Sequence, residues 1–244
     1  MIELRSLSFS YGKEPFLNID TVFDDRCLTA LIGENGSGKT TLLKLINGIE
    51  KPKTGSILID GHDISQASKK ETAKRLSYFP QSRPIPDMSV TETVMLGRYP
   101  HGGTDSAFVG ELLREVNAES LAHRSMKKLS FGERQRVYMA MLLAQNTKNC
   151  VFDEPVSFMD ISSAFSMMEG LRGICEGGGC VVCVLHDISL AMSYADRIVI
   201  MKNGVIYDDG TPDDLFEKGS MDTAFGIHLK KYESNGKAVY LPLP

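Results

Sequence analysis

A glycine-rich segment ending in lysine and threonine carries the clearest chemical signal in the sequence. Residues 33–40 have the order Gly-Glu-Asn-Gly-Ser-Gly-Lys-Thr, which fits the phosphate-binding pattern GxxxxGK[ST] between an expected strand and an expected helix. Glycines let backbone N–H groups surround phosphate oxygens, Lys39 adds positive charge, and the Thr40 hydroxyl suits Mg²⁺. The sequence therefore predicts a nucleoside triphosphate site with these contact residues: Gly33, Glu34, Asn35, Gly36, Ser37, Gly38, Lys39, Thr40 and Thr41.

Two adjacent carboxylates supply a second half to this site. Asp153 and Glu154 follow the apolar run 150–152, which we expect to be a strand. Asp153 suits the binding of Mg²⁺ through water, and Glu154 suits the polarisation of an attacking water. A solvated turn is the alternative explanation for such a pair, but the accompanying phosphate loop favours the catalytic one.

A third segment indicates which family of nucleotide-binding proteins the chain resembles. Residues 129–136 have the order Leu-Ser-Phe-Gly-Glu-Arg-Gln-Arg. Ser130 and Gly132 precede a strongly helical run, so they lie at a helix N-terminus, where the backbone dipole favours an anion. The segment resembles the signature LSGGQ of the ATP-binding cassette (ABC) ATPases, which stands at the same place before the Asp-Glu strand. Further marks of that family occur in the family's order, namely Tyr11, Gln81, residues 157–160 and His186, which comes 32 positions after Glu154.

The resemblance implies a role for each of these residues in ATP binding and hydrolysis. Tyr11 would stack on adenine, and Gln81 would reach Mg²⁺ and the water while sensing the membrane subunits. His186 would contact the γ-phosphate and orient the water. Each residue also has a simple structural explanation when it is considered alone. A tyrosine in a strand ordinarily belongs to the core or the surface, and a histidine before an aspartate ordinarily lies at the start of a helix. Their shared order and spacing favour the functional interpretation.

The resemblance also implies partners. In the family, two subunits enclose two ATP molecules, so Ser130 and Gly132 would bind the γ-phosphate held by a second copy. Asp160 would lie at that dimer interface. Integral-membrane permease subunits would be the other direct partners, contacted through residues 81–99, and an extracytoplasmic substrate-binding protein an indirect one.

Three further segments resemble the ATPases that serve iron–siderophore, haem and cobalamin importers: residues 96–101, 155–162 and 181–196. The predicted reaction is ATP hydrolysis to ADP and phosphate, coupled to uptake of an iron chelate or related metal chelate through separate permeases. Import of cobalamin or haem is the alternative cargo. A soluble ABC ATPase without a transport role, or a weakly hydrolysing regulatory module, is the alternative class of protein.

The sequence departs from the family pattern at several places. Phe131 replaces the first signature glycine, Glu133 replaces the glutamine, and Val156 replaces a usual threonine. We expect Asn149 to shorten the strand before Asp153. We also expect the Phe131 ring to point away from the nucleotide and to be buried in the helical part.

Composition limits the other function classes. The 244 residues are 42% hydrophobic with a net charge of −4, so nothing indicates nucleic-acid binding. No apolar run reaches the roughly 18 residues of a membrane helix, and the first residues lack a signal-peptide layout. We therefore expect a cytoplasmic chain that does not itself span a membrane, and the family resemblance implies a peripheral place on the cytoplasmic face of the membrane. Cys180 and Cys183 belong to an apolar strand on opposite faces, so we expect buried, inert thiols rather than a redox or metal pair.

Strands and helices alternate along the chain, which predicts a parallel sheet covered by helices. The predicted fold class is α/β, a P-loop NTPase of the ABC ATPase type with a RecA-like core, an antiparallel β subdomain and a helical insert. We expect one nucleotide-binding domain over residues 1–244, with a core at about 1–81 and 149–210. The helical subdomain would be about 82–148 and the C-terminal extension about 211–244.

Overall fold

The computed structural model of the chain describes residues 1–12, 16–103, 106–234 and 237–243. Its central element is a six-stranded sheet with the strand order β10-β9-β3-β8-β7-β6. The strands of this sheet are β3 (Cys27–Gly33), β6 (Leu76–Phe79), β7 (Asn149–Asp153), β8 (Cys180–Val184), β9 (Arg197–Lys202) and β10 (Val205–Gly210). Neighbouring strands are parallel except for the pair β9–β10, which is antiparallel. The predicted parallel sheet is confirmed.

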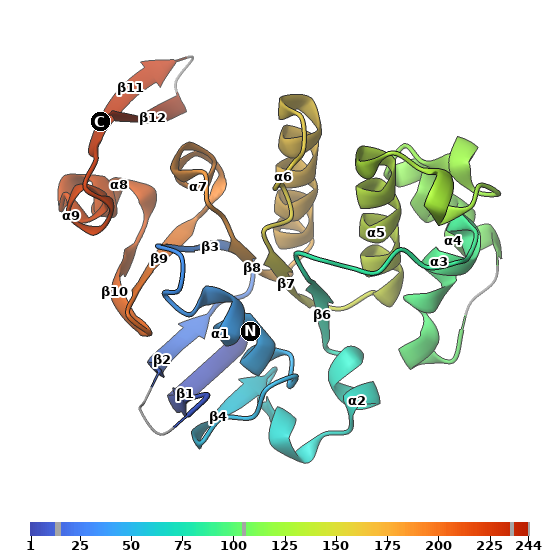
Figure 1. The fold of residues 1–244 in the computed structure, drawn as a ribbon, viewed down its shortest axis with the longest axis horizontal. Coiled ribbons are helices and arrows are strands. Elements are labelled where there is room, and N and C mark those ends of the chain that lie inside the picture. The colour runs from blue at the N-terminus through green and yellow to red at the C-terminus, as the bar shows by residue number, and fades with distance from the viewer. Residues whose placement is uncertain (13–15, 104–105, 235–236, 244) are drawn as a thin grey trace.

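A second, antiparallel sheet has the strand order β2-β1-β4-β5. Its strands are β1 (Ile2–Phe9), β2 (Leu17–Phe23), β4 (Thr54–Ile59) and β5 (His62–Asp63). Helix α1 (Lys39–Ile46) lies between the two sheets, where its leucines and Ile46 join one apolar cluster with both of them (Figure 1). The phosphate loop is therefore held by a helix that is buried on most sides.

The other face of the central sheet carries the long helix α6 (Ile161–Glu176) and the short helix α7 (Ile188–Tyr194), as Figure 1 shows. Helices α3 (Val90–Leu96), α4 (Ser106–Glu115) and α5 (Phe131–Gln145) pack against one another beside the sheet. Short 3₁₀ turns occupy residues Tyr99–His101, Glu119–Leu121 and Met126–Lys128. The helical character predicted for residues 88–146 is confirmed, with more interruptions than expected.

Two groups of smaller elements complete the described chain. A 3₁₀ turn at Ile64–Gln66 and helix α2 (Lys69–Ala73) follow the antiparallel sheet. At the other end come α8 (Pro212–Glu217), α9 (Ser220–Phe225) and a hairpin of β11 (His228–Ser234) and β12 (Lys237–Leu243), which was not predicted. Tyr240 of this hairpin is buried against Phe216 with ring centroids 5.6 Å apart, and β12 lies against α7. Among the described residues, no helix has the length and apolar character that crossing a membrane demands.

The two strand cysteines behave as predicted. Cys180 and Cys183 are both fully buried and belong to different apolar clusters, one on each face of the central sheet. Burial raises the pKa of Cys180 to about 12 and raises that of Cys183 well above its usual value. Both thiols therefore stay protonated and unreactive.

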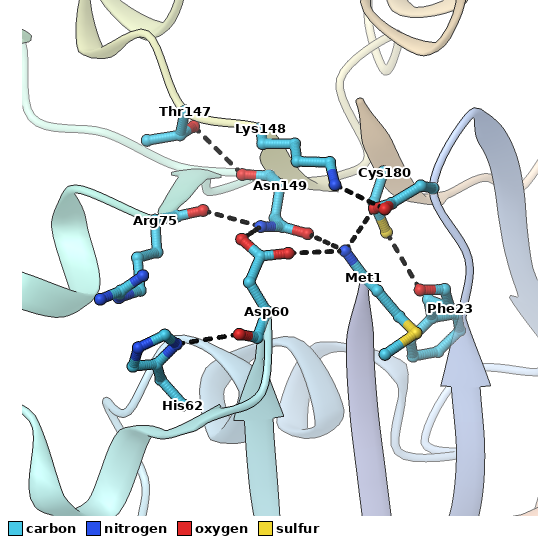
Figure 2. A network of polar contacts seen from close by, with 10 residues as sticks. Met1, Phe23, Asp60, His62, Arg75, Thr147, Lys148, Asn149 and Cys180 are labelled. Carbon is cyan, nitrogen blue, oxygen red and sulfur yellow. Dashed lines mark hydrogen bonds and ion pairs between the residues drawn. The ribbon is translucent and has the colours of Figure 1, made fainter. Parts of the chain in front are cut away.

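Asn149 does not shorten its strand, contrary to expectation. It begins β7 and is fully buried, and its amide joins three segments of the chain (Figure 2). The Nδ2 atom donates to Asp60 Oδ2 at 2.9 Å and to the Arg75 carbonyl at 3.0 Å, while Oδ1 accepts from the Met1 amine at 2.8 Å. A polar residue is tolerated at this buried position because each of its polar groups has a partner.

Candidate active site

The phosphate loop connects β3 to α1 and encloses a small cavity. Gly36 and Gly38 have φ angles of 82° and 104°, in the left-handed region that favours glycine. A Cβ atom on Gly33 would lie 2.2 Å from the Met201 carbonyl oxygen, so this close approach also requires glycine. The cavity is about 150 Å³ and is lined by Phe16, Asn35, Gly36, Gly38, Lys39, Thr40, Thr41, Glu154 and His186.

Lys39 directs its ammonium group into this loop. Its Nζ atom donates to the carbonyl oxygens of Gly33 at 2.7 Å and Glu34 at 3.0 Å. Burial lowers the pKa of Lys39, and the nearby carboxylates of Asp153 and Glu154 oppose that shift. Both hydrogen-bond partners are neutral, so the loop holds a buried positive charge that suits an anionic ligand.

Asp153 ends β7 beneath the loop. It is 1% exposed and accepts a hydrogen bond of 3.2 Å from Thr40 Oγ1. Burial raises the pKa of Asp153, because the carboxylate has been taken out of water. A hydroxyl and a carboxylate oxygen are the ligand types that Mg²⁺ prefers, and a divalent cation would compensate the buried charge. These residues therefore fit Mg²⁺.

Glu154 is held on both carboxylate oxygens by three side chains. His186 Nε2 lies 2.5 Å from Oε1, and Gln81 Nε2 and Ser157 Oγ donate to Oε2 at 2.6 and 3.0 Å. Gln81, Glu154 and His186 come just after β6, β7 and β8, which end at the same edge of the parallel sheet. The structure thus brings together three residues that are far apart in the sequence.

Tyr11 lies at the margin of the loop, and a second aromatic residue lies closer. Tyr11 is 62% exposed, its hydroxyl is 3.1 Å from Thr41 Oγ1, and its ring is 5.9 Å from that of Phe16. Phe16 lines the cavity, and Tyr11 is not among its lining residues. Phe16 was not among the predicted site residues, although its aromatic side chain directly before the second strand was an available signal.

Ser130 precedes α5, Gly132 is in its first turn, and neither residue lines the cavity. Ser130 caps the helix: Glu133 N donates to its hydroxyl at 3.3 Å, and Glu133 Oε2 accepts from Ser130 N at 2.7 Å. A Cβ atom on Gly132 would meet no atom within 4 Å. This helix start is open to solvent and is separate from the phosphate loop of its own chain.

The prediction that the Phe131 ring is buried in the helical part is wrong. The side chain is 38% exposed, and its ring lies edge-on to that of Phe158, with centroids 6.5 Å apart and an interplanar angle of 87°. The cause is position, because Phe131 is the first residue of α5 and the buried residues of that helix begin at Val137.

Asp160, two residues beyond Phe158, caps α6 by accepting a hydrogen bond from Ser163 N at 2.9 Å.

This geometry agrees with comparisons with known proteins. A family model described as ABC transporter matches residues 17–157. The chain belongs to the ABC transporter family. The achromobactin transport ATP-binding protein CbrD of Dickeya dadantii is 34% identical over 94% of this chain and 89% of its own length. The hemin import ATP-binding protein HmuV of Rhizobium meliloti is 37% identical over 83% of this chain and 82% of its own.

Solved structures support the same ABC assignment. A structure of an ATP-binding subunit of an ABC transporter superposes with a TM-score of 0.82 at 25% identity, covering 90% of this chain and 93% of that one. The ATP-binding cassette MJ0796, solved as a dimer bound to ADP and Pi, gives a TM-score of 0.77 at 24% identity over 87% and 99%. The predicted P-loop NTPase fold of the ABC ATPase type is therefore confirmed.

Proposed function

We propose that this chain is the ATP-hydrolysing subunit of an importer for an iron chelate, acting at the cytoplasmic face of a membrane beside separate permease subunits. The observation that carries the proposal is the placement of Glu154, held by Gln81 and His186, at the cavity of the phosphate loop. The class of cargo follows from relatives named for achromobactin and hemin.

The phosphates of ATP would lie along residues 33–41. The backbone N–H groups around Gly36 and Gly38 would donate to phosphate oxygens, and Lys39 would exchange its two carbonyl partners for them. Thr40, Asp153 and Gln81 would hold Mg²⁺, which supplies charge neutralisation between the phosphates. Phe16 and Tyr11 would offer their rings to the adenine.

Hydrolysis would be carried out by the side chains around Glu154. Its carboxylate takes a proton from the attacking water, and His186 fixes the direction of one carboxylate oxygen. Gln81 fixes the other oxygen, so it can report the state of the site to the segment that follows it. Lys39 takes up negative charge as it develops on the phosphate oxygens.

A second copy of the chain would complete each site. Ser130 and Gly132 lie at an open helix N-terminus outside their own cavity, so they could reach a phosphate only on another molecule. Asp160 would lie at the interface between the copies. We infer an ATP-dependent homodimer from this separation.

The permease would dock on the segment 81–99, beside a groove of about 950 Å³ between the antiparallel sheet and the helical part. Met88 and Ile85 are 40% and 42% exposed and offer an adaptable apolar contact. Met95 of the same segment packs against the core instead. A substrate-binding protein would deliver the chelate on the other side of the membrane.

Crosslinking tests the docking site. Arg83 is a poor position for a cysteine, because its guanidinium lies over the Phe79 ring at 3.2 Å. Asp87 has a side chain that is 81% exposed, so Asp87→Cys should crosslink to co-expressed permease, and Lys230→Cys on β11 should not. An intact complex without a crosslink at residue 87 would contradict the proposal.

Transport assays test the cargo. Membranes containing the chain, its permease and its binding protein should take up a ferric siderophore in an ATP-dependent manner. Haem is the second candidate, favoured by the relative named for hemin import. Uptake of haem but not of the siderophore would make haem the cargo and would rule out the siderophore.

A further inference from the structure

An aromatic contact joins two parts of the chain that have different tasks in hydrolysis. Phe131 follows Ser130 at the start of α5, and its ring lies 6.5 Å from that of Phe158. Phe158 follows Ser157, whose hydroxyl donates to Glu154 Oε2 at 3.0 Å. A continuous path of contacts therefore runs from the helix start at Ser130 to the carboxylate that activates water.

The segment between Glu154 and Phe158 is a tight turn. Both residues have positive φ angles, 52° and 65°, which residues other than glycine rarely adopt. Two backbone hydrogen bonds tighten the turn, from Ser157 N to the Glu154 carbonyl at 3.3 Å and from Met159 N to the Val156 carbonyl at 3.2 Å. Phe158 directly follows Ser157 within this hydrogen-bonded turn, so a shift of Phe158 would displace the backbone at Ser157.

The contact between the two rings lies on the outside of this turn. Phe158 is 88% exposed, whereas Val156 and Met159 on either side of it pack against the core. Edge-to-face contact is a favourable geometry for two phenylalanine rings. The pair is therefore an exposed link between α5 and the turn, rather than part of the hydrophobic core.

We propose that Phe131 and Phe158 form a positioning pair that couples the two ATP sites of the dimer. This inference rests on the proposed function, in which Ser130 serves the nucleotide of the partner subunit and Glu154 serves the nucleotide of its own. When Ser130 engages the partner's phosphate, Phe131 fixes Phe158, and Ser157 fixes the Glu154 carboxylate for hydrolysis. Binding at one site thus prepares the catalytic base of the other.

The size of the effect follows from the contact. An edge-to-face aromatic pair changes an equilibrium by about two- to tenfold. Couplings between sites are typically about five- to 150-fold, so the pair can supply a coupling at the lower end of that range. Its loss should remove cooperativity and leave most of the catalytic rate.

The test is the dependence of ATPase activity on ATP concentration in the full-length protein. The wild type should show a Hill coefficient above 1, with an upper limit of about 2 for two sites. Phe131→Ala and Phe158→Ala should each bring the coefficient close to 1 with a kcat change of less than about tenfold. The double variant should resemble each single one, because either change breaks the same contact.

Phe165→Ala is the matched control. Phe165 on α6 is 47% exposed and stacks on Tyr194 with ring centroids 6.4 Å apart, so its replacement by alanine removes a similar aromatic contact at the surface. This variant should keep the wild-type Hill coefficient. An equal loss of cooperativity in Phe165→Ala would overturn the proposal, because the effect would then be general packing.

Two further results would overturn the proposed coupling, and a separate measurement tests the proposed dimer. A wild type with a Hill coefficient of 1 contradicts the coupling, and so does unchanged cooperativity in both single variants. The proposed dimer is measured independently, from the ATP-dependent mass of Glu154→Gln. If that variant dimerises while Phe131→Ala stays fully cooperative, the coupling is wrong and the proposed function stands.

Discussion

His186 Nε2 lies 2.5 Å from Glu154 Oε1 at the carboxyl edge of the central sheet. The two residues are 32 positions apart in the sequence, but they follow the adjacent parallel strands β7 and β8. Gln81 donates to the other carboxylate oxygen from the far side, after β6. The sheet therefore fixes the direction of both carboxylate oxygens, which is the preorganisation that the proposed role of Glu154 as a general base requires.

The first prediction concerns this carboxylate. Glu154→Gln should retain ATP binding, lose hydrolysis by about 10²–10⁴-fold, and accumulate as a dimer in ATP. The amide preserves the shape and a hydrogen-bond acceptor, but it cannot take a proton from water. ATPase assays and light scattering with and without ATP measure the two effects.

Lys39→Ala is the control for that experiment. It should weaken nucleotide binding itself, because it removes the buried cation of the phosphate loop. No dimer should then form in ATP. Hydrolysis by Glu154→Gln at a near wild-type rate would show that another group is the base.

The second prediction separates the two residues of the signature. Gly132→Asp should abolish ATPase activity without unfolding the chain, since a Cβ atom at Gly132 meets open space. Its carboxylate would instead repel the phosphate of the partner's nucleotide. Phe131→Gly should change the rate by less than about tenfold, or ~1.4 kcal/mol, because its ring contacts Phe158 rather than the cavity.

Circular dichroism and thermal melting check the folded state of both signature variants. A hundredfold rise in the rate of Phe131→Gly would indicate that the ring blocks closure of the dimer. Wild-type activity in Gly132→Asp would place the helix start away from the nucleotide.

The third prediction concerns the buried amide of Figure 2. Asn149→Leu should lower the free energy of unfolding by about 1–3 kcal/mol, because the Asp60 carboxylate and the Arg75 carbonyl lose a buried donor. Affinity for ATP should change little, since Asn149 and Asp153 lie at opposite ends of β7.

Gln66→Leu, at an exposed position, is the matched control and should change stability by less than about 0.5 kcal/mol. Urea unfolding of both variants gives the comparison. Equal stability of Asn149→Leu and the wild type would mean that the network contributes nothing net.

Local sequence motifs were sufficient to predict the parallel sheet and every residue that lines the cavity except Phe16. The phosphate loop follows β3, and Asp153 and Glu154 lie at the end of β7, so their meeting at one sheet edge follows from the topology. Other features depend on tertiary contacts that no local pattern encodes. Asn149 is accepted in a buried strand because distant segments satisfy its amide, and Phe131 finds its partner in a loop 27 positions later.

The C-terminal hairpin illustrates the same limit. Residues 228–243 alternate weakly in polarity, and their strand character becomes clear only with β11 and β12 paired and Tyr240 buried against Phe216. A hairpin of this kind is stabilised by packing rather than by its own propensity.

The last prediction uses the conflict between stability and function at Asp153. This carboxylate is 1% exposed, and burial raises its pKa, so its charged form is disfavoured in the folded protein. Asp153→Asn should therefore raise Tm of the nucleotide-free protein by roughly 2–4 °C, which corresponds to ~1 kcal/mol in a chain of this size. The amide keeps the volume of the side chain, and the Thr40 hydroxyl can either donate to it or accept from it.

The same variant should lose the additional thermal stabilisation that Mg²⁺ gives in the presence of ATP, because a neutral amide is a weak ligand for a hard cation. Asp160→Asn is the control: its carboxylate is exposed and caps α6, a task that asparagine also performs, so neither Tm nor the Mg²⁺ effect should change. A lower Tm in nucleotide-free Asp153→Asn would show that the charge stabilises the empty site. An undiminished Mg²⁺ effect in that variant would move the cation away from Asp153.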